Sequence, residues 1–431
     1  MAQAAGRLAA LVSEVLGAPL PLRLRAWDGS EAGPVGTPVL VISSRRALHR
    51  LLWKPGELGL ARAWVAGEMT IEGDLYEALN RMAPVVWRRD ENAQARITLR
   101  DPRILGLAGR VLALAGPSLP PPPPPEEAPP SRRGLQHTLR GDRQAIHHHY
   151  DVGNDFYAEV LGPSFVYSCA YWADQDVTLE QAQEAKLDLV CRKLALRPGQ
   201  RLLDVGCGWG SMVLHAAEHY GVHAVGVTIS TEQADLARKR VVEAGLTDRV
   251  EIRIQDYRQI DDGPYDAISS IGMAEHVGSV AYRTYAEQLY GLLRPGGRLL
   301  NHQIARRPWS DESAYRIDEF IDRYVFPDGE LAPVGSTVTL LEQAGFEVRD
   351  LESIREHYAL TLRAWVANLE RNWSQAVRQV SPGRARVWRL YMAASALAFE
   401  QNAIGVNQVL AVRPGPGGAS GMPLVRGSWG S

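Results

Sequence analysis

The feature that most constrains the fold is a predicted strand that leads directly into a glycine-rich turn. Arg201–Val205 reads as a buried strand, and Gly206, Gly208 and Gly210 follow it at alternate positions. Glycine allows the backbone to turn sharply and to approach a ligand closely. Because ligands of open α/β sheets bind beyond the carboxyl ends of the strands, the pattern predicts a nucleotide or nucleoside site at this turn.

Strand-like and helix-like segments alternate from about residue 141 onward. After the strand at 201–205, further strands are expected at 224–228, 250–254, 267–270 and 298–301, with helical patterns between them. Strands that alternate with helices are typical of a parallel sheet covered on both faces. The predicted fold is therefore α/β, a doubly wound Rossmann-like class I methyltransferase domain preceded by a smaller α/β domain.

The residues around the turn favour one class of nucleoside. Asp204 precedes the glycines; an acid at a helix N-terminus would repel a pyrophosphate, as in NAD, but can receive a cationic amino-acid end. Thr228 and Gln233 follow the second strand, where a ribose would lie, and Asp256 and Tyr257 follow the third, where an adenine would lie. These residues predict binding of a sulfonium amino-acid nucleoside, S-adenosylmethionine, although a glycine turn alone also occurs in dinucleotide folds.

Composition places three segments along the chain. Residues 1–115 read as a small α/β domain for membrane docking or dimerisation, opening with an amphipathic helix near residues 8–16 and including a strand at 38–42. Residues 116–140 form a proline-rich linker with six consecutive prolines, and proline favours an extended spacer. Residues 141–431 are expected to be the methyltransferase domain with lipid-binding insertions.

Bulk composition narrows the functional classes. The net charge of −2 lacks the basic excess of a nucleic-acid binder, so no nucleic-acid partner is expected. Three cysteines fit a reducing compartment better than a disulfide framework. The apolar segment 104–115 is shorter than the ~20 residues of a membrane-spanning helix. The N-terminus does not read as a secretory signal, and a cytoplasmic protein peripheral to the inner face of the membrane is expected.

Several motifs together resemble the cyclopropane fatty acid synthase family, which includes the mycolic acid cyclopropane synthases. The matching segments are 149–157, 167–170, 206–210, 272–278, 301–304, 324–329 and 357–362. Residues 330–331 and 385–392 are most similar to the actinobacterial branch that forms 10-methylene stearoyl lipids, precursors of tuberculostearic acid. Some members carry a cysteine in the C-terminal helix, where this chain has Ser395, so no thiol is available there.

The resemblance implies roles for individual residues. It assigns the S-adenosylmethionine contacts to Tyr167, Ser168, Gly206, Gly208, Thr228, Gln233, Asp256 and Tyr257. Asp204 and Gly210, predicted from the turn itself, complete the cofactor set. It places a bound bicarbonate near the reacting carbon, surrounded by Cys169, Glu275, His302, Ile304 and Tyr358. No metal is expected, because the three adjacent histidines at 147–149 cannot all face one ion on a helix. Taken alone, Glu275 and His276 would read as an ordinary helix-end pair.

The activity implied by the resemblance is methylation of the cis double bond of an oleoyl-type chain in a phospholipid. Attack of the alkene on the sulfonium methyl leaves a carbocation; a hydride shift and proton loss to bicarbonate then give a 10-methylene chain. Immediate proton loss would instead close a cyclopropane ring, and a small-molecule methyltransferase or a lipid-binding scaffold are more distant alternatives. The expected partners are a membrane phospholipid, a second copy in a homodimer, and a reductase acting on the methylene product.

Overall fold

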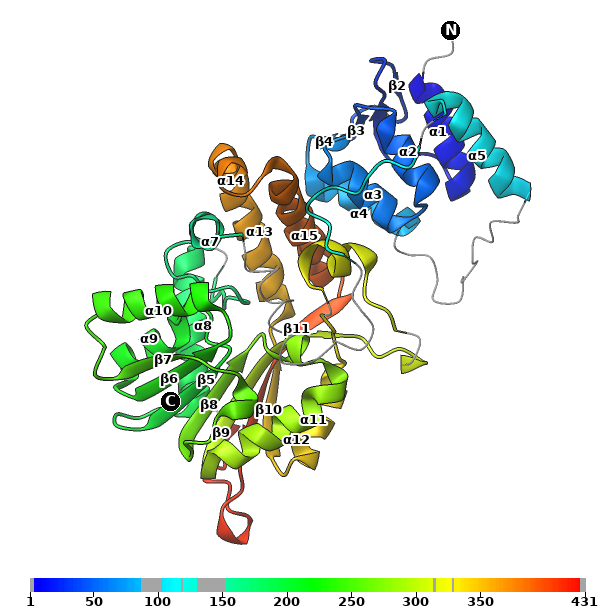
Figure 1. The fold of residues 1–431 in the computed structure, drawn as a ribbon. Coiled ribbons are helices and arrows are strands. Elements are labelled where there is room, and N and C mark those ends of the chain that lie inside the picture. Colours follow the sequence, from blue (N-terminus) through cyan, green and yellow to red (C-terminus); the bar gives the residue numbers. More distant parts are fainter. Residues whose placement is uncertain are drawn as a thin grey trace. The chain divides into compact units, whose positions relative to one another are not determined.

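The computed structural model describes residues 4–86, 102–117, 119–129, 152–174, 176–312, 315–327 and 329–426. The chain forms two compact units (Figure 1). One comprises Met1–Pro129 together with Asp318–Val325 and Ser381–Leu397, and the other comprises Pro130–Ile317, Phe326–Val380 and Ala398–Ser431. The histidine run at 147–149 lies outside the described residues.

The larger unit is built on a seven-stranded sheet with the order β10-β11-β9-β8-β5-β6-β7. Its strands are β5 (Arg201–Val205), β6 (His223–Thr228), β7 (Val250–Ile254), β8 (Tyr265–Ile271), β9 (Leu293–Arg306), β10 (Glu347–Ser353) and β11 (Ile404–Val412). The strands from β7 to β9 pair in parallel, whereas β11 pairs antiparallel with both β9 and β10. The central strand β5 is almost wholly buried, as its apolar sequence requires for a sheet covered on both faces.

Helices cover both faces of this sheet (Figure 1). The helical segments of this unit are α7 (Asn154–Leu161), α8 (Leu179–Leu194), α9 (Ser211–Tyr220), α10 (Thr231–Glu243), η1 (Tyr257–Gln259), α11 (Ala274–Leu292), α12 (Val334–Gln343), α13 (Arg355–Arg371), α14 (Trp373–Gln379) and η4 (Pro416–Gly418). One apolar core joins α8, α9 and α10 to the sheet. A second core joins α11 and α12 to it. The two cores fix the sheet between two helical layers.

The sequence predicted most of this unit correctly. All five expected strands are confirmed as β5 to β9, and the fold class is confirmed as α/β. The last of them, β9, is longer than predicted, because it begins before the turn at 295–297 and pairs with β11 as far as Arg306. The antiparallel strands β10 and β11 were not predicted.

The smaller unit combines a four-stranded sheet with helices. The sheet has the order β2-β1-β3-β4. Its elements are α1 (Ala4–Leu16), β1 (Arg23–Arg25), β2 (Glu31–Ala32), β3 (Val39–Ile42), α2 (Arg46–Trp53), α3 (Glu57–Val65), β4 (Met69–Glu72), α4 (Leu75–Val86), α5 (Pro102–Ala115), the π-helical turn η3 (Ile321–Val325) and most of α15 (Pro382–Glu400). The predicted N-terminal helix and the strand at 38–42 are confirmed as α1 and β3.

The end of the proline-rich segment is anchored within this smaller unit. The Glu127 carboxylate is almost fully buried and accepts hydrogen bonds from Arg62, Arg323 and the Tyr324 hydroxyl. The Ala128 backbone N–H donates to the Arg323 carbonyl at 2.8 Å. The two guanidinium groups compensate the buried charge of Glu127 and hold the end of the proline-rich segment in place. Removing any one of the charged partners would leave a buried charge uncompensated.

None of the helices in the described part of the chain is long and apolar enough to cross a membrane.

Candidate cofactor cleft and active site

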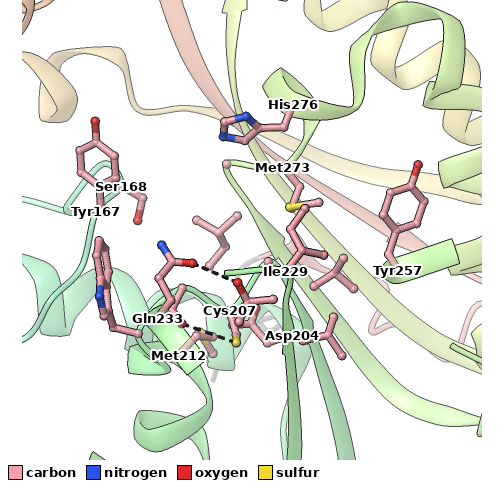
Figure 2. A pocket seen from close by; sticks show the side chains of 18 of the residues that line it. Tyr167, Ser168, Asp204, Cys207, Met212, Ile229, Gln233, Tyr257, Met273 and His276 are labelled. Carbon is pink, nitrogen blue, oxygen red and sulfur yellow. Dashed lines mark hydrogen bonds between the residues drawn. The ribbon is translucent and has the colours of Figure 1, made fainter. Parts of the chain in front are cut away.

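A cleft opens at the carboxyl ends of β5, β6, β7 and β8, next to the point where the strand order reverses. It holds about 1190 Å³ of empty space, open solvent at its mouth included. All of the predicted cofactor residues except Gly210 line it. Figure 2 shows Tyr167 and Ser168 across the cavity from Met273 and Tyr257, with Asp204 and Cys207 on its floor. This is the position at which doubly wound folds bind nucleotides.

The glycine turn shapes the floor of the cleft. Gly206 has φ +78°, and a Cβ built there would lie 2.4 Å from the Met273 Sδ atom. The backbone N–H groups of Gly206 and Cys207 both donate to the Val227 carbonyl at 2.9 Å, which ties the turn to β6. Gly210 caps α9 and faces Ala237 instead of the cleft. The close approach of Met273 therefore favours glycine at position 206, and packing against Ala237 favours glycine at position 210.

Asp204 supplies a buried negative charge beneath the turn. Its carboxylate is 3% exposed and accepts a 2.6 Å hydrogen bond from the Ser269 hydroxyl. Burial raises the pKa of Asp204 to about 6, with the serine and the Lys186 ammonium acting in the opposite direction. Asp204 therefore remains mostly ionised at neutral pH and can attract a cationic group in the cleft.

The tips of β6 and β7 carry polar side chains, as predicted. Thr228 donates to Gln233 at 3.0 Å, and Ser230 caps α10 by accepting from the Gln233 backbone N–H. Asp256 caps η1 and pairs with the Arg258 guanidinium at 2.7 Å. The Asp256 carboxylate is thus held in place before any ligand arrives, which preorganises this wall.

The predicted catalytic residue Glu275 lies in the first turn of α11. Its Oε1 atom accepts a 2.7 Å hydrogen bond from the Ile304 backbone N–H, which accounts for the place of Ile304 in the predicted set. Its Oε2 atom is shielded from solvent and has no hydrogen-bond partner among the described residues. Burial raises the pKa of Glu275 to about 7. The Glu275 carboxyl group therefore titrates near neutral pH, and its Oε2 atom is available to contact a ligand.

His302 lies on the same face of β9 as Ile304, two residues earlier, and next to the loop that lines the cleft. The Gly272 backbone N–H donates to the His302 carbonyl at 2.9 Å. Burial and the ammonium groups of Lys186 and Lys193 hold the pKa of His302 far below its usual range, so its ring is neutral. Its Nε2 atom is shielded and has no hydrogen-bond partner among the described residues.

A chain of hydrogen bonds determines which nitrogen of His302 carries the proton. Lys193 pairs with Glu352 and donates to the Gln408 Oε1 atom at 2.7 Å. The Gln408 amide nitrogen therefore faces His302 Nδ1, 3.3 Å away, and can only donate to it. Because Nδ1 accepts, the proton of the neutral ring lies on Nε2, the unpartnered nitrogen. The site thus presents an N–H donor on His302 and a carboxyl oxygen on Glu275, each without a hydrogen-bond partner among the described residues.

The two remaining predicted residues lie at the start of α13 and beside it. Cys169 is fully buried, and its thiol donates to the carbonyls of Ala170 and Ile354. Burial raises the pKa of Cys169 well above its usual range, so the thiol does not ionise. Tyr358 packs on Phe399, with the ring centroids 4.7 Å apart. Neither residue lines the cleft.

An aromatic contact connects these residues to the cofactor cleft. The Trp365 ring is fully buried and lies 5.4 Å from Tyr167 and 6.0 Å from Tyr358, measured between ring centroids. Backbone contacts also join the two sides, since Val406 pairs with Ile304 and accepts from the Ile354 N–H. The predicted residues are therefore linked through shared neighbours at one end of the sheet.

Sequence reasoning missed several residues that line the cleft. Lys186, Met212 and Met273 were not singled out, and His276 was interpreted as structural. Burial lowers the pKa of His276 to about 4, so it is neutral in the cleft. Among the described residues, no group of three or more His, Cys, Asp or Glu side chains is placed to hold a metal ion.

Comparison with known proteins identifies the family. The family model described as mycolic acid cyclopropane synthetase matches residues 137–409. A "Probable fatty acid methyltransferase" of Mycobacterium tuberculosis is 44% identical over 94% of this chain and 94% of its own length. The tuberculostearic acid methyltransferase UfaA1 of the same organism is 32% identical over 92% of this chain and 89% of its own length.

A solved structure supports the same conclusion. The crystal structure of the mycolic acid cyclopropane synthase CmaA1, in complex with S-adenosylhomocysteine (SAH) and CTAB, superposes with a TM-score of 0.59 at 33% identity. It covers 62% of this chain and 97% of its own. The matched region includes the glycine turn, the cleft around it, and the strand that carries His302. The chain therefore belongs to the mycolic acid cyclopropane synthetase family of S-adenosylmethionine-dependent methyltransferases.

Proposed function

We propose that the enzyme transfers a methyl group from S-adenosylmethionine to the cis double bond of an unsaturated acyl chain in a phospholipid and forms a 10-methylene chain. The carrying observation is the pair of shielded, unpartnered polar atoms beside the cofactor cleft, Glu275 Oε2 and His302 Nε2. Methylation of an oxygen or nitrogen atom needs no such pair. An alkene substrate does, because its carbocation must lose a proton where water is excluded.

The residues present fit a small bound anion such as bicarbonate. His302 offers an N–H donor, Glu275 offers a carboxyl oxygen, and both atoms lack partners in the described structure. Bicarbonate held there would supply the base that removes the proton from the carbocation. Glu275, with its pKa raised to about 7, would accept a hydrogen bond from the hydroxyl of such an ion, and Tyr358 and Cys169 would complete the surroundings.

The names of relatives favour the methylene product. UfaA1, at 32% identity over most of both chains, is a tuberculostearic acid methyltransferase. The 10-methylene lipids expected from the family resemblance are precursors of that acid. In this route a hydride moves from the methyl-bearing carbon to the neighbouring cation, and the methyl then loses a proton to become an exocyclic methylene. The family name and CmaA1 favour the second candidate, in which the methyl loses its proton at once and a cyclopropane ring closes.

Lipid analysis separates the two products. We would express the gene in a host that makes oleoyl phospholipids, feed methyl-deuterated methionine and analyse the acyl chains by mass spectrometry. Either route adds one carbon that retains two deuterium atoms, but ozonolysis cleaves an exocyclic methylene to a ketone and leaves a cyclopropane intact. Unmodified acyl chains, with cofactor bound by the purified enzyme, would overturn the lipid substrate. Loss of turnover in carbonate-free buffer, restored by added bicarbonate, is the result expected for the anion.

A phospholipid substrate requires contact with the membrane, which we propose occurs from the cytoplasmic side through the smaller unit. Large apolar side chains are exposed there, with Trp53 52%, Val35 84% and Leu119 85% exposed. The partly exposed Lys54 and Arg46, which pair with Glu319 and Glu68, lie near Trp53 in the sequence. Exposed aromatic and basic groups together favour anionic lipid surfaces. Replacing Trp53 with Ala is expected to reduce sedimentation with anionic vesicles; equal sedimentation of the variant and the parent would contradict this role.

Two partners follow from the proposal. A reductase that saturates the exocyclic methylene would consume the product, and a second copy of the chain is proposed to form a homodimer. Light scattering of the purified protein tests the dimer, and a monomeric mass at micromolar concentration would contradict it.

A further inference from the structure

Lys186 is a buried cation in the larger unit. It lies on α8, which begins with a capping box formed by Thr178 and Gln181. Its side chain is among the largest in the described structure that are less than 2% exposed, and it lines the cofactor cleft. Within the described part of the chain, no hydrogen bond or ion pair holds its ammonium group.

The contrast with Lys193, two turns further along α8, shows that this is unusual. Lys193 is also buried, but it pairs with Glu352 and donates to Gln408. A buried charge without a partner costs several kcal/mol of folding free energy. Burial accordingly lowers the pKa of Lys186 to about 8, and Asp204 is the group that most opposes this. An ammonium kept in such a place, facing a cleft, points to a ligand that carries negative charge.

The lining of the cleft therefore includes one buried cation, Lys186, and one buried anion, Asp204. Asp204 receives its hydrogen bond from Ser269, not from Lys186, and both Lys186 and Asp204 line the cavity. The amino-acid end of S-adenosylmethionine carries an α-carboxylate and an α-ammonium group. Its two charges are complementary to those of Lys186 and Asp204 in the lining of the cleft.

We propose that Lys186 binds the α-carboxylate of the cofactor, while Asp204 attracts its α-ammonium group. This inference rests on the family's use of S-adenosylmethionine and not on the lipid substrate. Lys186 and Asp204 would orient the amino-acid end and so aim the sulfonium methyl out of the turn. The adenosine end would be held independently, at the tips of β6 and β7.

Calorimetry with three nucleosides tests the assignment directly. SAH carries both charged groups, its decarboxylated analogue retains only the ammonium, and 5′-methylthioadenosine carries neither. The parent protein is expected to bind SAH roughly 10- to 100-fold more tightly than the decarboxylated analogue, as for a hydrogen bond between charged groups. Lys186→Met is expected to abolish this difference and to leave the affinity for 5′-methylthioadenosine unchanged. Lys186→Arg should retain part of the difference.

Lys193→Met is the matched control, because it removes a buried ammonium from the same helix outside the cleft. It should preserve the ratio of the two affinities. Equal binding of SAH and its decarboxylated analogue by the parent protein would overturn the proposal, even if Lys186→Met did not fold. So would a Lys186→Met variant that binds all three nucleosides equally more weakly. Failure to alkylate lipids, with the affinity ratio intact, would refute only the proposed substrate.

Discussion

Replacing Gln408 with Glu should move the proton of His302 from one ring nitrogen to the other. In the parent protein, the Gln408 amide can only donate to Nδ1, because its oxygen accepts from Lys193. A carboxylate at this position would accept from Nδ1–H instead, and Nε2 would lose its proton. The change leaves the shape of the residue nearly the same and alters only what it offers to the ring.

The size of the effect follows from the hydrogen bond that each tautomer makes. In the parent protein, the disfavoured tautomer carries its proton on Nδ1 of His302, which faces the amide N–H donor of Gln408. That buried Nδ1–H has no acceptor, which costs about 1–3 kcal/mol. This corresponds to a ratio of about 5- to 150-fold between tautomers, which the carboxylate would reverse. If the Nε2–H group of His302 holds the anion, turnover should fall by a factor in the same range.

Two measurements check the reasoning separately. Nitrogen-15 NMR of histidine-labelled protein reports which nitrogen of His302 is protonated, and turnover on vesicles of oleoyl phospholipid reports the rate. Gln303→Glu is the control variant. It places a carboxylate one residue after His302 on β9, but the Gln303 side chain pairs with Asn301 and Thr337, so the tautomer of His302 should not change. Protonation of Nδ1 in the parent protein, or a parental rate in Gln408→Glu, would refute the reasoning.

Three further changes have defined outcomes. Glu275→Gln should lower turnover at pH 8 by roughly 100-fold or more, as for loss of a group that assists proton transfer. It should also abolish the rise in rate expected of the parent protein through about pH 7, because the Glu275 carboxylate forms as the pH passes its raised pKa. Gly206→Ala places a methyl 2.4 Å from the Met273 Sδ atom and should abolish cofactor binding measured by calorimetry. Glu127→Gln leaves the guanidinium groups of Arg62 and Arg323 without their buried anion and should lower stability by about 3 kcal/mol in thermal unfolding, with cofactor affinity retained.

Each change has a matched control on the same chain. Glu287→Gln removes a carboxylate from an exposed pair on α11 and should leave the pH profile unaltered. Gly291→Ala, also on α11, adds a methyl to open space and should preserve cofactor binding. Glu77→Gln breaks an exposed pair in the smaller unit and should change stability by less than about 1 kcal/mol. A parental pH profile for Glu275→Gln, parental affinity for Gly206→Ala, or parental stability for Glu127→Gln would contradict the corresponding prediction.

The sequence was informative where local pattern determines structure. β5 to β9 are apolar runs bounded by turn residues, and the glycine turn is encoded within a few positions. Strands β10 (Glu347–Ser353) and β11 (Ile404–Val412) were not predicted. β10 is a partly exposed edge strand that carries four charged residues among its seven, so it lacks the apolar run of a buried strand. Both strands depend on antiparallel pairing with distant partners.

The candidate site divides in the same way. Most of the cofactor residues lie at or just after strand ends and were predictable from local pattern, whereas Tyr167 and Ser168 came from the family resemblance; all but Gly210 line the cleft. Lys186 and Gln408 were not predictable, because a single lysine or glutamine between other polar residues gives no sign that it is buried. Their roles depend on the tertiary structure. Lys186 is buried without a partner in the described structure, whereas the contacts with Lys193 and His302 fix the orientation of the Gln408 amide.

The make-up of the smaller unit has a consequence for biosynthesis. Its members come from three stretches of chain, and Trp64 donates through its indole nitrogen to the carbonyl of Arg386, more than three hundred residues later. The ribosome must therefore synthesise the chain as far as α15 before the smaller unit can complete its fold. Until then, the apolar surfaces of the smaller unit that α15 will cover are accessible to chaperones and proteases. Most strands of the larger unit's sheet are synthesised before α15, so that sheet can begin to fold first.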